Sequence, residues 1–207
     1  MSRSEFLHKG FISKLRHEPT PCQDALLQKV ADFVSNDDDD IFVVNGYAGT
    51  GKTTAISSVI STLKEYGVKC VLMAPTGRSA KVLSSYAGQP AYTIHKQIYR
   101  QKSVGGDGFG QFSLAPNKAK DTLFVVDEVS LIGIDTGQQQ STSSFGSGNL
   151  LDDLVTFVRS GAGCKVILIG DSAQLPPVGL EASPALLKDY MVMIGGTQCA
   201  ERTTVVR

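Results

Sequence analysis

The chain has 207 residues, 42% of them hydrophobic, and a formal net charge of zero. This length suffices for one large α/β domain and is short for two, while the neutral charge neither indicates nor excludes a nucleic-acid partner. No apolar run is long enough to span a membrane, residues 1–10 lack the apolar core of a signal peptide, and the four cysteines include no C-x-x-C pair. We therefore expect a cytoplasmic protein with no membrane partner, no disulfide framework and no zinc site.

The predicted elements alternate between helices and strands along the chain. A helix is expected after Thr20, because Pro21 suits the first helical position and Gln23 completes a capping-box pattern. Apolar strands are expected at residues 41–45, 68–73, 122–126 and 165–169, and a further one at 191–194. The following helices are expected at residues 54–66, from 77 to about 85, and from the N-cap Asn149 onward.

Apolar strands that alternate with helices predict an α/β fold, a mostly parallel sheet with helices on both faces. Sheets of this kind bind ligands beyond the carboxyl ends of their strands. The polar segment 135–148 lies outside this pattern. We expect it to be a mobile surface loop or a segment that becomes ordered on a ligand.

The most specific pattern follows the first strand, where residues 46–53 read GYAGTGKT and match G-x-x-x-x-G-K-[ST]. A strand, a glycine-rich loop and a helix N-terminus in this order direct backbone N–H groups at a phosphate chain. We predict a nucleoside triphosphate site in which Lys52 reaches the β- and γ-phosphates and Thr53 ligates Mg²⁺. The predicted contact residues of the loop are Gly46, Ala48, Gly49, Thr50, Gly51, Lys52, Thr53 and Thr54.

Polar side chains also follow the strands at 122–126 and 165–169. We predict that Asp127 holds Mg²⁺ through water and that Glu128 polarises the water that attacks the γ-phosphate, although such a pair can also be a surface cap. Gln174 lies in the sequence GDSAQLPPVG at 170–179. Its amide can hydrogen-bond the γ-phosphate or the attacking water without adding charge, and the alternative is a proline turn with a solvated glutamine.

The segment 74–120 is basic although the whole chain is neutral. It contains seven Lys or Arg residues and a single acid, Asp107, with tyrosines and phenylalanines between them. Cations for the phosphates and aromatic rings for the bases are typical of single-strand binding, but a basic face over core aromatics fits the composition equally well. Residues 102–118 contain the sequence GGDG at 105–108 between β-capable residues and are expected to form a small hairpin.

Four motifs in chain order, GYAGTGKTT, APTGRSAKVL, VVDEVS and GDSAQLPPVG, resemble motifs I, Ia, II and III of superfamily 1 DNA helicases. The resemblance is nearest to the RecD-like group of the 5′-to-3′ branch and covers residues 20–207. It implies a RecA-like P-loop NTPase that serves as the first motor domain, uses ATP with Mg²⁺ and moves on single-stranded DNA. Replication, repair or recombination is the implied setting.

The resemblance also implies roles for residues outside the phosphate loop. Gln23 matches a glutamine that recognises adenine, although it equally fits the capping box at Thr20. Arg207 loosely matches the arginine that contacts the γ-phosphate in the motif leading to a second motor domain. The hairpin stands where relatives carry a wedge, but its shortness gives that role little support. The residues that match DNA-contacting motifs are Pro75, Thr76, Gly77, Arg78, Thr93, His95 and Lys96.

These inferences predict an N-terminal extension at residues 1–19 and a RecA-like ATP-binding domain at residues 20–207, with a DNA-facing insertion at 84–120 and no second motor domain. Such a half-motor would hydrolyse ATP slowly alone and would not unwind DNA. A second motor domain or a helicase or nuclease partner chain is expected to complete it. The alternatives are a self-contained oligomeric P-loop ATPase and a nucleotide-gated DNA-binding module without enzymatic activity.

Overall fold

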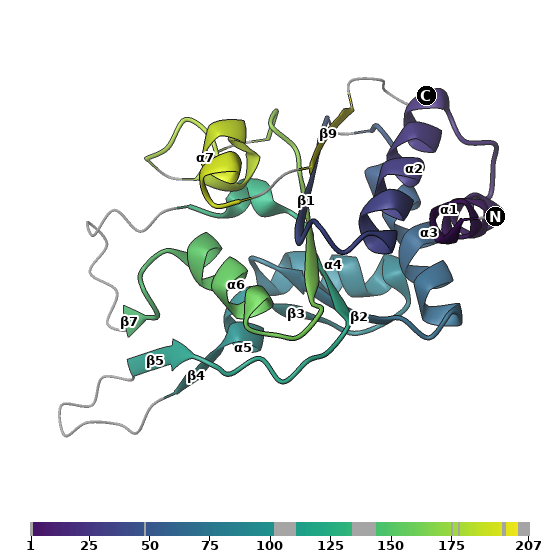
Figure 1. Cartoon of the computed structure of the whole chain (residues 1–207). Coiled ribbons are helices and arrows are strands. Elements are labelled where there is room, and N and C mark those ends of the chain that lie inside the picture. The colour runs from purple at the N-terminus through teal and green to yellow at the C-terminus, as the bar shows by residue number, and fades with distance from the viewer. Residues whose placement is uncertain are drawn as a thin grey trace.

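A six-stranded sheet in which all neighbouring strands are parallel runs through the molecule (Figure 1). This computed structural model describes residues 2–47, 49–101, 111–133, 144–174, 176–177, 179–195 and 198–202. Because β8 separates β1 from β6, the carboxyl ends of these three strands lie side by side, and the loops that follow them share one edge of the sheet. The strand order is β3 (Ala91–Thr93), β2 (Lys69–Ala74), β6 (Thr122–Val126), β8 (Lys165–Gly170), β1 (Ile41–Gly46) and β9 (Gln198–Arg202).

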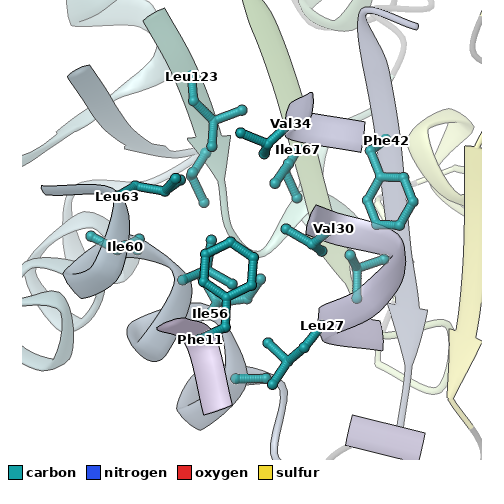
Figure 2. Packing of buried hydrophobic residues seen from close by; sticks show 14 of the residues in the cluster. Phe11, Leu27, Val30, Val34, Phe42, Ile56, Ile60, Leu63, Leu123 and Ile167 are labelled. Atoms are coloured by element: carbon teal, nitrogen blue, oxygen red, sulfur yellow. The ribbon is translucent and has the colours of Figure 1, made fainter. Parts of the chain in front are cut away.

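Helices cover both faces of this sheet, because successive residues of each strand point to opposite sides and both sides are apolar. Phe42 and Ile167 belong to one core, shown in Figure 2, whereas Ile41, Val43 and Leu168 belong to the other. The first core is covered by α1 (Arg3–Ser13), α2 (Pro21–Ser35), α3 (Lys52–Glu65) and α4 (Gly77–Ala87). The second is covered by α5 (Ile94–Ile98), α6 (Leu150–Arg159), α7 (Lys188–Met193) and the 3-10 turns η1 (Val129–Leu131) and η2 (Pro184–Leu186). Within the described ranges, every helix is too short or too polar to span a membrane.

A second, smaller sheet consists of β4 (Tyr99–Gln101), β5 (Gln111–Leu114) and β7 (Ser144–Phe145). β4 and β5 pair antiparallel, as the hairpin prediction requires, and the tip at 102–110 lies outside the described residues. β7 pairs with β5 inside the segment predicted to be a loop, of which 135–143 lies outside the described residues. Asp153 of α6 connects β4 to the turn after β7, since its carboxylate accepts hydrogen bonds from the Tyr99 hydroxyl (2.7 Å) and the Ser147 backbone N–H (2.9 Å).

Most predicted elements are confirmed close to their expected ranges, including the capping box that Thr20 and Gln23 form at the start of α2. The predicted strand at 191–194 is wrong. These residues form the end of α7 and the turn after it, and the Ile194 backbone N–H donates to the Tyr190 carbonyl at 3.1 Å. A short apolar run fits a buried strand or one side of a helix, and only packing distinguishes them. The outer strand is instead β9, while α1 and β3 are further elements that the sequence analysis does not predict.

Helix α1 lies in the segment expected to be an N-terminal extension, and it packs into the first core through Leu7 and Phe11. Phe11 is fully buried, and Figure 2 shows its ring among residues of α2 and α3. The Thr62 hydroxyl of α3 also donates to the Gly10 carbonyl of α1 at 3.1 Å. The fold of the described chain therefore includes α1.

We expect Phe11→Ala to lower the free energy of unfolding by about 3–5 kcal/mol, because it leaves a cavity in a closely packed core. Urea unfolding followed by circular dichroism measures this loss. Phe6→Ala is the matched control, since Phe6 lies on the same helix with 50% of its surface exposed. Equal losses in the two variants would show that α1 is not anchored through Phe11.

Candidate functional site

The phosphate loop joins the end of β1 to the start of α3. Gly49 and Gly51 have φ angles of 76° and 74°, in the left-handed region that disfavours side chains. Gly51 is the N-cap of α3 and has no side chain with which to cap it, so the first N–H groups of this helix are open to a ligand. Thr50 is buried, and its hydroxyl donates to the Tyr47 carbonyl at 2.8 Å. The loop is therefore held in a shape that suits an anion.

Lys52 is the first residue of α3, and its side chain folds back over the loop. Its Nζ donates to the carbonyl oxygens of Gly46 and Tyr47, the latter at 2.9 Å. The same atom lies 3.9 Å from a carboxylate oxygen of Asp171, whose side chain is only 3% exposed. A phosphate would replace neutral carbonyls by charged oxygens, which bind an ammonium group more strongly. Lys52 is therefore placed to bind the phosphate chain.

The acidic pair begins where β6 ends. The Asp127 backbone N–H donates to the Met73 carbonyl of β2 at 3.0 Å, and its carboxylate oxygen Oδ1 accepts from the Glu128 backbone N–H at 2.9 Å. Glu128 has a φ of 58°, a conformation that is costly for a residue with a side chain and is common at functional sites. Burial, then the charge of Asp127, raises the pKa of the Glu128 carboxyl, and hydrogen bonding to Gln174 and the charge of Lys52 lower it.

Gln174 is held on the loop that follows β8. Its side-chain Oε1 accepts a hydrogen bond from the hydroxyl of Ser130 at 3.1 Å, and its backbone N–H donates to the Asp171 carbonyl at 3.2 Å. Ser130 is buried in η1, directly after the acidic pair. The loop after β8 is therefore joined to the loop after β6 by the hydrogen bond between Ser130 and Gln174.

These groups surround one pocket with a volume of about 450 Å³. Its position at the carboxyl ends of β1, β6 and β8 follows from the strand order. Thr53 lines the pocket, whereas Ala48 lies outside the described residues and Thr54 is exposed on α3 without lining it. The lining residues are Tyr47, Gly49, Thr50, Gly51, Lys52, Thr53, Asp127, Glu128, Asp171 and Gln174.

Gln23 is fully buried in the first turn of α2 and is not among the lining residues of this pocket. Its side-chain Oε1 accepts from the Thr20 backbone N–H at 3.1 Å, and its own backbone N–H donates to the Thr20 hydroxyl at 3.2 Å. The capping alternative is therefore realised in the structure. The amide nitrogen Nε2 of Gln23 is buried and has no hydrogen-bond partner among the described residues.

A second hollow of about 570 Å³ lies between α4 and the segment of β3 and α5. It brings Gly77 and Lys81 of α4 opposite Tyr92, Thr93 and Lys96, and we call it the α4–α5 groove. Lys96 Nζ lies 5.5 Å from the centre of the exposed Tyr92 ring, so a cation and an aromatic face meet at its rim. This pairing suits a phosphate next to a stacked base.

Other residues of the matched DNA motifs have local structural roles. Thr76 caps α4 by accepting from the Ser79 backbone N–H at 3.1 Å, and Thr93 caps α5 in the same way through Lys96 at 3.3 Å. Burial lowers the pKa of His95, whose ring lies 5.6 Å from that of Tyr99. Pro75, Thr76, Arg78 and His95 do not line the α4–α5 groove, although Thr76 and Arg78 are exposed.

A family of proteins described as the AAA domain matches this chain over residues 22–193. The chain belongs to the AAA domain family. The matched residues extend from α2 to α7 and include the phosphate loop, the acidic pair and Gln174. This AAA domain therefore carries the whole pocket within the matched region.

Curated relatives of this AAA domain include DNA helicases. The ATP-dependent RecD2 DNA helicase of Deinococcus radiodurans is 34% identical over 138 residues, which are 67% of this chain and 16% of that protein. The ATP-dependent DNA helicase dda of Enterobacteria phage T4 is 29% identical over 177 residues, which are 79% of this chain and 34% of that protein. The chain thus spans a minor part of each relative, and the predicted resemblance to RecD-like helicases is confirmed.

A solved structure shows the same fold. The crystal structure of Pif1 helicase from Candida albicans aligns with a TM-score of 0.50 and 18% sequence identity over 91% of this chain and 41% of that chain. The similarity confirms the predicted RecA-like P-loop fold with its mostly parallel sheet.

Four residues of this AAA domain take part in the site although they are not among the predicted site residues, namely Tyr47, Ser130, Asp171 and Tyr86. Tyr47, Ser130 and Asp171 lie inside the motifs GYAGTGKTT, VVDEVS and GDSAQLPPVG, so their closeness in the chain to predicted site residues is a signal that the sequence offers. Tyr86 has no such signal. Its hydroxyl donates to Oδ2 of Asp127 at 2.5 Å across 41 positions of the chain.

Proposed function

We propose that the chain is the ATP-binding and ATP-hydrolysing motor domain of a DNA helicase that acts on single-stranded DNA. The convergence of the phosphate loop, the acidic pair and Gln174 on one pocket carries this proposal. The relatives RecD2 and dda are both ATP-dependent DNA helicases, which supports it. Because the chain spans a minor part of each relative, we propose unwinding activity only for an assembly that also contains the parts this chain does not cover.

The donor set of the pocket fits Mg²⁺ together with a triphosphate. Thr53 offers a hydroxyl and Asp127 a carboxylate, the hard oxygen ligands that this cation prefers, and both line the pocket beside Lys52. When bound, Mg²⁺ supplies positive charge that offsets the charge developing on the phosphates. Thr53 would ligate the cation directly, and Asp127 would hold it through water.

The other polar side chains of the pocket have separate roles in phosphate binding and hydrolysis. Lys52 leaves the carbonyls that it now contacts and binds the β- and γ-phosphates. Glu128 orients the attacking water and accepts its proton, a task that suits a carboxyl with a raised pKa. Gln174 donates to the γ-phosphate or the water from a loop fixed by Ser130 and Asp171. The spare amide donor of Gln23 supports adenine recognition beside its capping role.

Several finer parts of the proposal rest on the family resemblance. Arg207 lies outside the described residues, and we propose it as the arginine that contacts the γ-phosphate in the complete motor. A second motor domain, or a helicase or nuclease partner, would complete the site. We further propose a cytoplasmic location and a role in replication, repair or recombination. We also propose an N-terminal extension at 1–19, whose helix α1 packs against a motor domain at 20–207 with its DNA-facing insertion at 84–120.

We propose that single-stranded DNA lies in the α4–α5 groove, where Lys81 and Lys96 face a phosphate path and Tyr92 offers a stacking face. Pro75, Arg78 and His95 then act from the borders of this groove. The helix-capping roles of Thr76 and Thr93 are compatible with DNA contact, because each cap uses one lone pair of the hydroxyl oxygen.

Binding of a fluorescent oligothymidylate, measured by anisotropy at several salt concentrations, tests the groove. We expect Tyr92→Ala to weaken binding roughly 5- to 150-fold, because it removes a stacking surface. Lys96→Ala is expected to lower the slope of log affinity against log salt by about 0.7, the value for one phosphate contact on a single strand. Lys29→Ala, at an exposed site on α2, is the control and should change neither quantity. Unchanged binding in both groove variants would place the DNA elsewhere.

A further inference from the structure

The phenol of Tyr86 contacts the carboxylate that is proposed to hold Mg²⁺. Its hydroxyl donates to Oδ2 of Asp127 at 2.5 Å, while Oδ1 of the same carboxylate accepts from the Glu128 backbone N–H at 2.9 Å. The two hydrogen bonds approach the carboxylate from different elements, namely α4 and the strand end itself. Together they fix the plane of the Asp127 carboxylate, which a single hydrogen bond would leave free to rotate.

Tyr86 is also tied to the helix of the phosphate loop. Its backbone carbonyl accepts a hydrogen bond from the Ser57 hydroxyl of α3 at 3.1 Å, and its ring packs beside the first core. The last turn of α4 is therefore anchored to two elements that surround the nucleotide pocket.

The other side of α4 faces the groove proposed for DNA. Lys81, Ser84 and Ser85 line the α4–α5 groove, and Ser85 directly precedes Tyr86 in the chain. After Tyr86, α4 ends at Gly88, whose φ of 64° turns the chain toward β3 and Tyr92. One short helix thus contacts the groove with one side and the Asp127 carboxylate with a residue of its last turn.

We propose that Tyr86 is a positioning residue that orients the Asp127 carboxylate for Mg²⁺ and links its orientation to occupancy of the α4–α5 groove. The inference rests on the proposed function, since it assigns a partner to the same metal site. Hydrogen-bonding residues in the outer shell of a metal site commonly matter 10- to 100-fold for metal affinity. When single-stranded DNA in the groove shifts α4, the Tyr86 hydroxyl moves with the helix. The Asp127 carboxylate then follows the hydroxyl, because its other hydrogen bond comes only from the Glu128 backbone N–H.

The test measures how much Mg²⁺ the protein needs to bind a fluorescent, non-hydrolysable ATP analogue, with and without oligothymidylate. Tyr86→Phe keeps the ring and removes the hydroxyl. We expect it to raise the Mg²⁺ concentration at half-saturation about 10-fold, while binding of the analogue in EDTA stays unchanged. Oligothymidylate should shift the midpoint of the parent protein about fivefold or more, and should not shift that of Tyr86→Phe.

Two further variants separate positioning from a general loss of structure. Tyr66→Phe removes the hydroxyl of a tyrosine that caps the far end of α3, outside the nucleotide pocket, and should behave like the parent protein. In an Asp127→Asn background, adding Tyr86→Phe should not move the Mg²⁺ midpoint further, because Tyr86 acts through Asp127. An additional shift in that background, or an equal effect of Tyr66→Phe, would contradict the positioning role.

The outcomes distinguish the inference from the function on which it rests. A parent protein that binds the analogue no better with Mg²⁺ than in EDTA overturns both the proposed metal site and the role of Tyr86. A parent protein that needs Mg²⁺, together with a Tyr86→Phe variant whose midpoint lies within twofold of it, overturns only the role of Tyr86. A parent midpoint that does not respond to oligothymidylate overturns the link to the groove.

Discussion

Replacing Lys52 with alanine is expected to weaken binding of Mg²⁺–ATP by roughly 10- to 150-fold, because hydrogen bonds from a charged group to phosphate oxygens contribute about 1.5–3 kcal/mol. We expect this loss because the Lys52 ammonium group lies over the phosphate loop, 3.9 Å from a carboxylate oxygen of Asp171, where it can contact the phosphates. Fluorescence titration with a labelled, non-hydrolysable ATP analogue measures the affinity. The loss should be much smaller for an analogue of adenosine that carries no phosphate.

The matched control for this prediction is Lys64→Ala, which removes an exposed lysine from the last turn of the same helix. It should bind the analogue as the parent protein does. Because Lys52 also contacts the Gly46 and Tyr47 carbonyls, thermal unfolding of each variant is compared in the absence of nucleotide. A folded Lys52→Ala variant with unchanged affinity would show that the triphosphate does not bind at the phosphate loop.

Glu128→Gln is expected to reduce ATP hydrolysis by roughly 10²- to 10⁴-fold and to leave nucleotide affinity close to that of the parent protein. Glutamine keeps the size of the side chain and its contact with the Gln174 region, but it cannot accept a proton from the attacking water. Release of labelled phosphate over long incubation measures the rate even if this chain turns over slowly. Glu18→Gln, at an exposed position before α2, is the control.

The parent protein in the same assay distinguishes the alternatives for the function. Turnover that oligothymidylate stimulates and that Glu128→Gln abolishes would mean that the site is complete in this chain, and gel filtration with ATP would then show an oligomer. Lys52-dependent binding with very slow turnover favours a half-motor that needs a second domain. Binding without any phosphate release from the parent protein favours a nucleotide-gated module.

Residues within one motif can be interpreted from the sequence because their geometry is local. The glycines at 49 and 51 and the start of α3 at Lys52 lie within a few residues of one another, and the left-handed turn that they form needs no distant contact. The capping pair of Thr20 and Gln23 is predictable for the same reason. Whether Gln23 also meets a ligand depends on surroundings that the local pattern does not contain.

The short run at 191–194 shows where this reasoning fails. Its apolar residues fit a strand, but Met191 alone is buried, Val192 and Met193 are exposed, and the segment is helical. The strand that follows in the chain and pairs with β1 is instead β9 (Gln198–Arg202). All four residues are apolar, so the run at 191–194 shows neither the alternation of a half-buried strand nor the spacing of a helix, and the packing of neighbouring elements determined the outcome.

The sequence by itself determined the type of site: a phosphate loop, an acidic pair and a glutamine, each following an apolar strand, together with the α/β class of the fold. Only the tertiary structure decided which of these groups meet, because the order β6–β8–β1 brings together strand ends that are far apart in the chain. It also decided that Tyr86 contacts Asp127 and that Ser130 contacts Gln174. Such contacts depend on the packing of whole helices and loops against the sheet, and no local pattern of residues encodes that packing.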